Sequence, residues 1–390
     1  MKKLIMILLF ITLLVGCWNS HEIDDSLFVI GAGINRSDGN LIFSTESIKP
    51  TSAGTSPQGQ TKDNVILQIR SKSMLNAGRQ FIRYAKRRLF FTHCRTWIIG
   101  EELAKEEFVK QLDILRRHEM LRLNSYLFIT PGDPLAILKN PSLYDDLSSM
   151  EIISAIDQTE YNAEYPVINL REFYRLLEEE TRNAHLPIIT TRRVDGSTVT
   201  SLEGTAIINN NRMVGKLTIN ESVGLNILLN KAKGGSLTVE LGEDEEENWA
   251  TVNVKDCYAK IKPRLEGNKV KVDIEVNVVG LLGEYVTNDE VSEDFILQVE
   301  EKASEVTKEL VHNTIKKLQQ LETDAMKLGV YMHRKYPKEW QKLKDNWNEY
   351  FKEADVSVHV DHDVRDPGLL MNNLQQKQEN EPDRSLYSIF

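Results

Sequence analysis

The sequence predicts a mixed α/β fold of the α+β class, with more than one domain and with sheets packed by helices. Two observations lead to this fold class. Strand-like runs alternate with amphipathic helical patterns over residues 65–130, and such alternation is typical of a sheet covered by helices. Strand patterns separated by turns over residues 237–279 predict an antiparallel meander, and long helical patterns follow it. The 390 residues, 41% of them hydrophobic, suffice for the cores of roughly two or three domains.

The chain opens with a pattern typical of a bacterial lipoprotein signal peptide. Two lysines precede an apolar run at residues 4–15. As a helix this run is roughly 18 Å long, well short of the roughly 30 Å hydrocarbon core, so it predicts a signal peptide and not a membrane span. The sequence Leu-Val-Gly-Cys then predicts cleavage after Gly16 and S-diacylglycerol on Cys17, whose freed amino group is available for N-acylation. The alternative is an ordinary secretory leader with an incidental cysteine.

The charge of the chain indicates that the anchor is covalent. The formal charge is −10, and removal of Lys2 and Lys3 with the leader makes it −12. An acidic chain is not drawn electrostatically to an anionic bilayer or to nucleic acid. No later stretch reaches 18 consecutive apolar residues. The sequence therefore predicts a protein held by lipid on the outer face of the cytoplasmic membrane, without nucleic-acid binding.

After a lipidated tether at residues 17–26, strands and helices are expected to alternate. Residues 37–40, Ser-Asp-Gly-Asn, predict a hairpin turn, whereas residues 50–62 lack apolar periodicity and predict a surface loop. Asn169 is expected to cap a helix together with Glu172. The expected strands are 27–34, 41–48, 65–69, 90–99, 126–130 and 186–190, and the expected helices are 74–89, 103–115, 134–138, 145–162 and one that begins after Asn169.

Residues 192–202 are rich in Asp, Gly, Ser and Thr and predict the boundary between two halves. The second half is expected to begin with a hairpin that turns at residues 209–212, because asparagine tolerates the left-handed conformation of tight turns. Asn220, the Thr287-x-x-Glu290 capping box and Pro337 are expected to begin helices, the second of them about 30 residues long. The predicted segments are a signal peptide at 1–16, the tether at 17–26, domains at 27–191 and 192–368, and a disordered tail at 369–390; the later strands are 237–241, 250–261, 269–279 and 356–364.

Signals for catalysis are weak throughout the chain. No Gly-x-Ser-x-Gly, His-Glu-x-x-His or Walker lysine motif is present, so we expect neither an enzyme nor a bound cofactor. The best metal candidates are His359, Asp361 and Asp363, which would share one face of a strand. A strand at a sheet surface gives the same alternation without a metal. The acidic cluster at residues 243–247 lacks the donor pattern of a calcium loop and is expected to be solvated.

Two further groups of residues each allow two interpretations. Cys94 and Cys257 are too sparse for a disulfide scaffold, so they are either buried free thiols or one bridge. Trp340, Trp347 and Phe351 form an aromatic stripe at helical spacing. The stripe either packs beneath the C-terminal sheet or faces a partner or the bilayer.

A dense basic cluster follows the first predicted helix. It contains Arg83, Lys86, Arg87 and Arg88. Such a cluster is either a solvated helix end or a surface that meets lipid headgroups or an acidic partner. The sequence alone leaves both interpretations open.

Three groups of residues carry a family resemblance through their order and spacing. They are Gly16-Cys17-Trp18 with Glu22-Ile23 after it; Arg88-Leu89 and His93 leading into Ile98-Ile99-Gly100-Glu101-Glu102-Leu103-Ala104; and Tyr336-Pro337-x-x-Trp340 followed by Trp347 and Phe351. Together they resemble the Ger(x)C family, the lipoprotein C subunits of spore germinant receptors, over nearly the whole mature chain. The chain departs from the family at Asn19, where aspartate is usual, and at residues 326–334, which match a glycine-rich stretch loosely.

The resemblance implies a non-enzymatic subunit on the outer face of the spore inner membrane, assembled with two integral-membrane subunits, of A-type and B-type. It implies a role in the response to nutrients and leaves open whether this subunit contacts the nutrient. Two alternatives share the lipid anchor. A solute-binding lipoprotein of a transporter needs two doubly wound parallel lobes around a cleft. A cell-wall or spore-cortex hydrolase needs paired carboxylates or a metal in one pocket.

Overall fold

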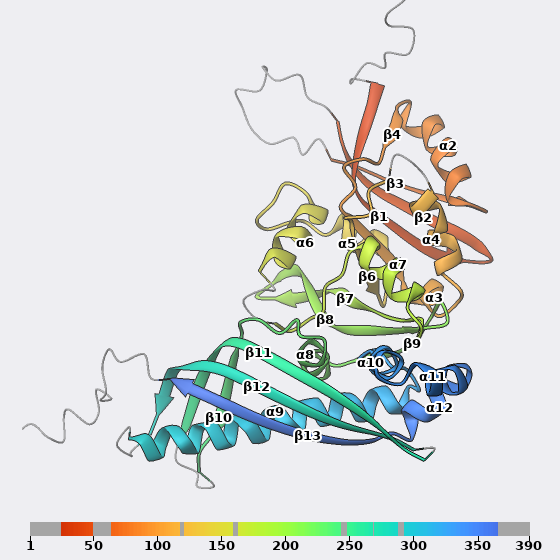
Figure 1. The fold of residues 1–390 in the computed structure, drawn as a ribbon. Coiled ribbons are helices and arrows are strands. Elements are labelled where there is room, and N and C mark those ends of the chain that lie inside the picture. Colours follow the sequence, from red (N-terminus) through yellow and green to blue (C-terminus); the bar gives the residue numbers. More distant parts are fainter. Residues whose placement is uncertain are drawn as a thin grey trace, which may run out of the picture.

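The computed structural model describes residues 25–49, 64–117, 121–158, 163–242, 248–267, 269–287 and 292–365. Within these ranges, nine strands form one sheet and four strands form a second, smaller sheet (Figure 1). Helices pack against both sheets, which confirms the predicted mixed α/β fold class. The signal peptide, Cys17 and the tether up to residue 24, the loop at residues 50–62, the acidic cluster at residues 243–247 and the tail at 369–390 lie outside the described residues.

The larger sheet is mixed. Its order is β3-β2-β1-β5-β6-β7-β8-β9, and β4 pairs with the beginning of β1. The predicted turn between the first two strands is confirmed, since Asp38 and Gly39 both have positive φ. The strands β1, β5, β6 and β7 run parallel, because crossover segments with helices connect them. The strands are β1 (Ser26–Ser37), β2 (Asn40–Ile48), β3 (Asn64–Ser71), β4 (Arg88–Phe90), β5 (Thr96–Gly100), β6 (Tyr126–Thr130), β7 (Asn183–Val194), β8 (Ser197–Asn209) and β9 (Arg212–Leu217).

Helices cover both faces of the larger sheet. Trp97 and Ile99 of β5 pack on the side of α2, α3, α4 and α7, whereas Ile98 packs on the side of α5 and α6. Every residue of β5 is buried, as in a strand covered on both faces. Helix α5 lies directly on β1, because a Cβ at Gly33 would be 2.4 Å from the Cβ of Pro134. The helices are α2 (Met74–Ala85), α3 (Glu101–Ala104), α4 (Val109–Arg117), α5 (Pro134–Lys139), α6 (Ser148–Asp157) and α7 (Leu170–Glu178).

The larger sheet continues past the predicted boundary at residue 192. Strands β7 and β8 pair around Asp195 and Gly196, whose φ angles are 47° and 82°. Asp-Gly between two strands is a strong hairpin signal, because both residues accept positive φ. The next turn has Asn210 and Asn211 at φ angles of 47° and 68°, which confirms the predicted asparagine turn. The division into domains at residue 192 stays a prediction.

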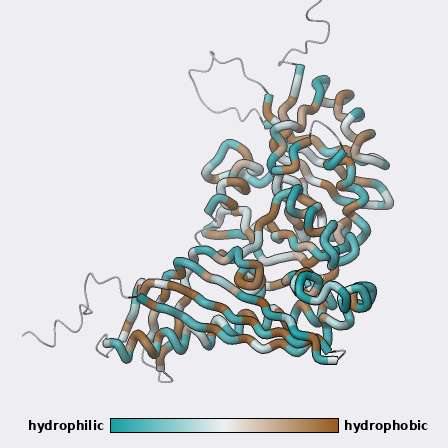
Figure 2. The backbone as a smooth tube through the Cα atoms, in the orientation of Figure 1, coloured by the Kyte–Doolittle hydropathy of each residue, from teal (hydrophilic) through white to brown (hydrophobic). Residues whose placement is uncertain are grey.

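The smaller sheet has long strands with one buried face. Strands β10, β11 and β12 are antiparallel, which confirms the meander, but the last strand β13 pairs parallel to β12. The helices after β12 return the chain to the start of the sheet, so a parallel pair results. Burial alternates along β12, and in Figure 2 the strands of this sheet change between hydrophilic and hydrophobic along their length. The strands are β10 (Ser236–Glu240), β11 (Trp249–Glu266), β12 (Lys269–Val286) and β13 (Asp355–Arg365).

Two predicted helix starts need correction, whereas the predicted start at Pro337 is confirmed. Thr218, not Asn220, caps α8, because its side chain and that of Glu221 form a capping box. Ser292, five residues after Thr287, caps the long helix α9, which begins at Glu293. The C-terminal helical pattern from Pro337 is interrupted by a short 3₁₀ turn, so it forms two helices. The elements are α8 (Ile219–Leu228), α9 (Glu293–Gln320), α10 (Leu328–Lys335), α11 (Pro337–Leu343), η3 (Lys344–Asn346) and α12 (Trp347–Lys352).

The predicted capping of α7 by Asn169 together with Glu172 is confirmed for Asn169. The side chain of Asn169 accepts a hydrogen bond from the backbone N–H of Glu172 at 3.0 Å. The side chain of Glu172 binds Lys231 at 2.7 Å, so it ties α7 to the segment after α8. Among the helices described, none is both long and apolar enough to cross a membrane.

Candidate functional site

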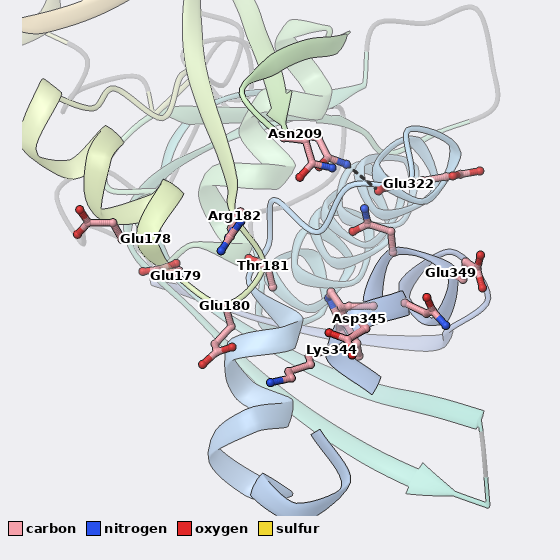
Figure 3. A pocket seen from close by; sticks show the side chains of 14 residues that line it. Glu178, Glu179, Glu180, Thr181, Arg182, Asn209, Glu322, Lys344, Asp345 and Glu349 are labelled. Carbon is pink, nitrogen blue, oxygen red and sulfur yellow. Dashed lines mark hydrogen bonds between the residues drawn. The ribbon is translucent and has the colours of Figure 1, made fainter. Parts of the chain in front are cut away.

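A cleft of about 680 Å³ lies between the end of α7, the β8–β9 turn and the C-terminal helices (Figure 3). Segments far apart in the sequence therefore meet here. Six carboxylates and two cations line the cleft, so the formal charge of its wall is −4. The carboxylates are Glu178, Glu179, Glu180, Glu322, Asp345 and Glu349, and the cations are Arg182 and Lys344.

Several of these carboxylates join α7 to the helices that follow α9. Glu179 binds Lys327 at 3.3 Å. Glu180 lies 3.5 Å from Nδ1 of His333 and accepts a hydrogen bond from Nε1 of Trp340 at 3.3 Å. The cleft wall is therefore part of the joint between the two halves of the chain. Cations outside the lining pair with several of these carboxylates, among them Arg116 with Glu178 and Lys352 with Glu322, and offset much of the charge of the wall.

Asp324 lies beneath the cleft and organises its floor. This carboxylate is fully buried and accepts hydrogen bonds from the backbone N–H groups of Leu328 at 2.8 Å and Gly329 at 2.6 Å. Nε1 of Trp347 donates a third hydrogen bond at 2.9 Å. Burial raises the pKa of Asp324 to about 7, although these hydrogen bonds act in the opposite direction. A Cβ at Gly329 would be 2.8 Å from Nε1 of Trp347, so only glycine allows this approach.

The cleft gathers several carboxylates in one place, which is one of the requirements stated above for a hydrolase. Among the residues that line it, no serine, cysteine or histidine stands beside a general base. In the described part of the chain, no group of three or more His, Cys, Asp or Glu side chains is placed to hold a metal ion. The contacts that the cleft residues make join the two halves of the chain.

Two family models match the chain over most of its length. The model of the spore germination protein N-terminal domain covers residues 19–191, and the model described as spore germination B3/GerAC like, C-terminal, covers residues 203–368. This chain belongs to the Ger(x)C family. The family prediction from the sequence is thereby confirmed.

The relatives match this Ger(x)C protein from end to end. Spore germination protein KC of Bacillus subtilis is 26% identical over 402 residues, which cover 96% of this chain and 97% of the relative. Spore germination protein GerQC of Bacillus cereus is 24% identical, with coverage of 95% and 99%. The crystal structure of the GerBC protein superposes with a TM-score of 0.53 at 20% identity and covers 86% of this chain and 96% of that one. This likeness concerns the fold.

The structure does not assemble the metal candidates of this Ger(x)C protein into a site. His359, Asp361 and Asp363 lie on the exposed face of β13, and Asp363 pairs with Arg365 at 2.6 Å. His362 points the other way and is buried. The alternation is therefore that of a strand at a sheet surface.

The aromatic stripe packs in the core, as one of its two interpretations expected. Trp340, Trp347 and Phe351 are all buried. The rings of the two tryptophans meet edge to face with centroids 5.0 Å apart. They belong to the core of the smaller sheet, so their helical spacing reflects packing.

Both internal cysteines are free and buried in different cores. Cys94 belongs to the core of the larger sheet and Cys257 to that of the smaller sheet. Burial raises the pKa of the Cys257 thiol to about 12, so it is an inert core residue. The basic cluster lies at the end of α2, where Lys86 adopts φ 53° and ends the helix, and continues to Arg88 of β4.

The sequence analysis missed the cleft carboxylates and Asp324. The run of three glutamates at residues 178–180 was a visible signal at a helix end. Nothing local indicated Asp324, because its partner Trp347 is 23 residues away and becomes its neighbour only in the fold.

Proposed function

We propose that this chain is the membrane-anchored lipoprotein subunit of a nutrient germinant receptor. It acts by assembly with integral-membrane subunits of A-type and B-type and not by catalysis. Cys17 carries the lipid on the outer face of the spore inner membrane. The observation that carries the proposal is the match of both family models over residues 19–368, directly behind a lipoprotein cleavage pattern.

The described residues support a binding role. The cleft joins the two halves through ion pairs, as a scaffold for assembly would. The solute-binding alternative requires two similar parallel lobes. Here one sheet is mixed and large, whereas the other is mainly antiparallel, so that alternative loses its support.

The test is nutrient germination of spores that carry Cys17→Ala or a deletion of the gene. Both strains should lose the nutrient response to the same degree, because an unanchored subunit is not held beside its membrane partners. Gly16→Ala is the matched control, since it keeps a small residue before the cysteine and should germinate normally. The protein should also shift from the membrane fraction to the soluble fraction in Cys17→Ala. Normal germination of both the deletion strain and Cys17→Ala would refute the proposal.

A further inference from the structure

Positive charge is concentrated in one segment of this acidic chain. Residues 64–100 contain eight Lys and Arg side chains and no Asp or Glu, whereas the whole chain has a charge of −10, which leaves −18 for the rest. Most of these basic residues belong to α2 and to the segment after it. Such separation gives one end of the molecule a field opposite to that of the remainder.

The exposed face of α2 combines this charge with apolar side chains. Leu75 and Ile82 are seven residues apart, about two helical turns, and therefore share a face. They are exposed by 50% and 45%, although most large apolar residues of the protein are buried. Arg79, Arg83 and Lys86 continue the same stripe at helical spacing and are exposed. An apolar strip flanked by cations is typical of helices that lie in a membrane interface.

This face lies at the end of the molecule where the described chain begins. Arg88 of β4 pairs with Ser26 at the start of β1. In Figure 1, α2 and β4 lie at the end of the larger sheet remote from the smaller sheet. Ser26 lies nine positions after Cys17, and nine residues span at most about 30 Å. A lipid on Cys17 would therefore bring this end, and not the smaller sheet, to the bilayer.

We propose that the exposed face of α2 lies on an anionic lipid surface. Leu75 and Ile82 enter the headgroup region, and the neighbouring cations contact lipid phosphates. The face thereby fixes the orientation of the subunit and presents its cleft and smaller sheet away from the bilayer. This inference rests on the proposed function, because the anchor supplies the proximity that short-range charge attraction requires.

The test separates the α2 face from acylation. The mature chain with Cys17→Ser is tethered to vesicles through an N-terminal histidine tag and a nickel-chelating lipid. A fluorophore on Ile82→Cys, with a quencher placed in the bilayer, reports contact; the two native thiols are buried and do not compete. With phosphatidylglycerol in the vesicle, quenching should be strong, and in phosphatidylcholine alone or at high salt it should be about tenfold weaker.

Two controls make the result specific to this face. A fluorophore on Leu297→Cys, exposed by 56% on α9, should stay unquenched. Arg79→Glu with Arg83→Glu and Lys86→Glu should abolish quenching at position 82, whereas the same reversal at Lys255, Lys260 and Lys338, which are also exposed, should not. Equal quenching at positions 82 and 297, or none with either lipid, would overturn the inference. Burial of position 82 that occurs only when the membrane contains the integral-membrane subunits would also overturn it, because the α2 face would then contact protein and not lipid. Because the tether replaces the lipid, none of these outcomes bears on Cys17.

Discussion

The two sheets bury their strands in different ways. The larger sheet has helices on both faces, and β5 is buried at every residue. The smaller sheet has its buried residues on one face, against α9 and the C-terminal helices, and β12 alternates between buried and more exposed positions. The difference follows from connectivity, because parallel strands need crossover helices that cover both faces, whereas a meander leaves one face open.

A buried carboxylate of the larger sheet also differs from the exposed charge pairs of the smaller sheet. In the larger sheet, Glu46 is fully buried and accepts hydrogen bonds from the backbone N–H groups of Ser148 at 3.1 Å and Ser149 at 2.8 Å. Burial raises the pKa of Glu46, and these hydrogen bonds act in the opposite direction. On the open face of the smaller sheet, charged residues form exposed cross-strand pairs instead. Glu46 is thus held inside the fold, whereas these charged pairs of the smaller sheet face solvent.

The largest expected difference in stability is between alanine variants of one aromatic residue in each sheet. Trp97 of β5 is 1% exposed and stacks with Phe43 at a centroid distance of 6.3 Å, whereas Tyr258 of β11 is 55% exposed. Trp97→Ala should lower the free energy of unfolding by about 4 kcal/mol, because it opens a cavity in the core. Tyr258→Ala should change it by less than about 0.5 kcal/mol. Urea denaturation of the mature chain measures both.

The stability losses of Trp97→Ala and Tyr258→Ala could also turn out to be alike. A loss of similar size for both variants would mean that the open face of the smaller sheet is covered in solution. Trp97→Phe serves as the control for the larger sheet, since it keeps an aromatic ring against Phe43 and should cost less than Trp97→Ala.

The contrast between the sheets was visible in the sequence, but the contacts between distant segments were not. The turn at residues 37–40 and the meander turn at Glu266 and Gly267 carry local signals that act within a few residues. In contrast, the pairing of Glu46 with Ser149 spans 103 residues. Only the three-dimensional packing creates such neighbours, so neither this pairing nor the cleft could be predicted.

A smaller effect on the free energy of unfolding is expected from His362, the buried histidine of the smaller sheet. His362 lies 3.1 Å from the hydroxyl of Ser304, and burial lowers its pKa from 6.5 to about 4. Below pH 6.5 the unfolded chain binds a proton that the folded chain rejects, so stability falls as the pH falls from 6.5 toward 4. Between pH 7 and pH 5 this group should account for a loss of about 2 kcal/mol. His362→Asn, which does not titrate, should lack that part of the loss.

The difference in pH dependence between wild type and His362→Asn reports His362 alone, because the other titrating groups are present in both proteins. Asp324 titrates in both proteins, and its raised pKa gives a contribution of opposite sign. Burial also lowers the pKa of His185 in the larger sheet, so His362→Asn should keep a remaining loss at low pH. The measurement is urea denaturation of both proteins at the two pH values. Identical pH dependence in wild type and His362→Asn would show that folding does not lower the pKa of His362.

The smallest effect on the free energy of unfolding is expected from an ion pair on the open face of the smaller sheet. Arg264 of β11 pairs with Asp273 of β12, which also accepts a hydrogen bond from the hydroxyl of Ser357 at 2.8 Å. The side chain of Arg264 is 60% exposed, so water and salt screen the pair. Arg264→Ala should therefore lower the free energy of unfolding by less than about 1 kcal/mol, and less still at high salt. A loss that is several-fold larger and insensitive to salt would mean that this face is desolvated, and the contrast between a two-sided and a one-sided sheet would no longer hold.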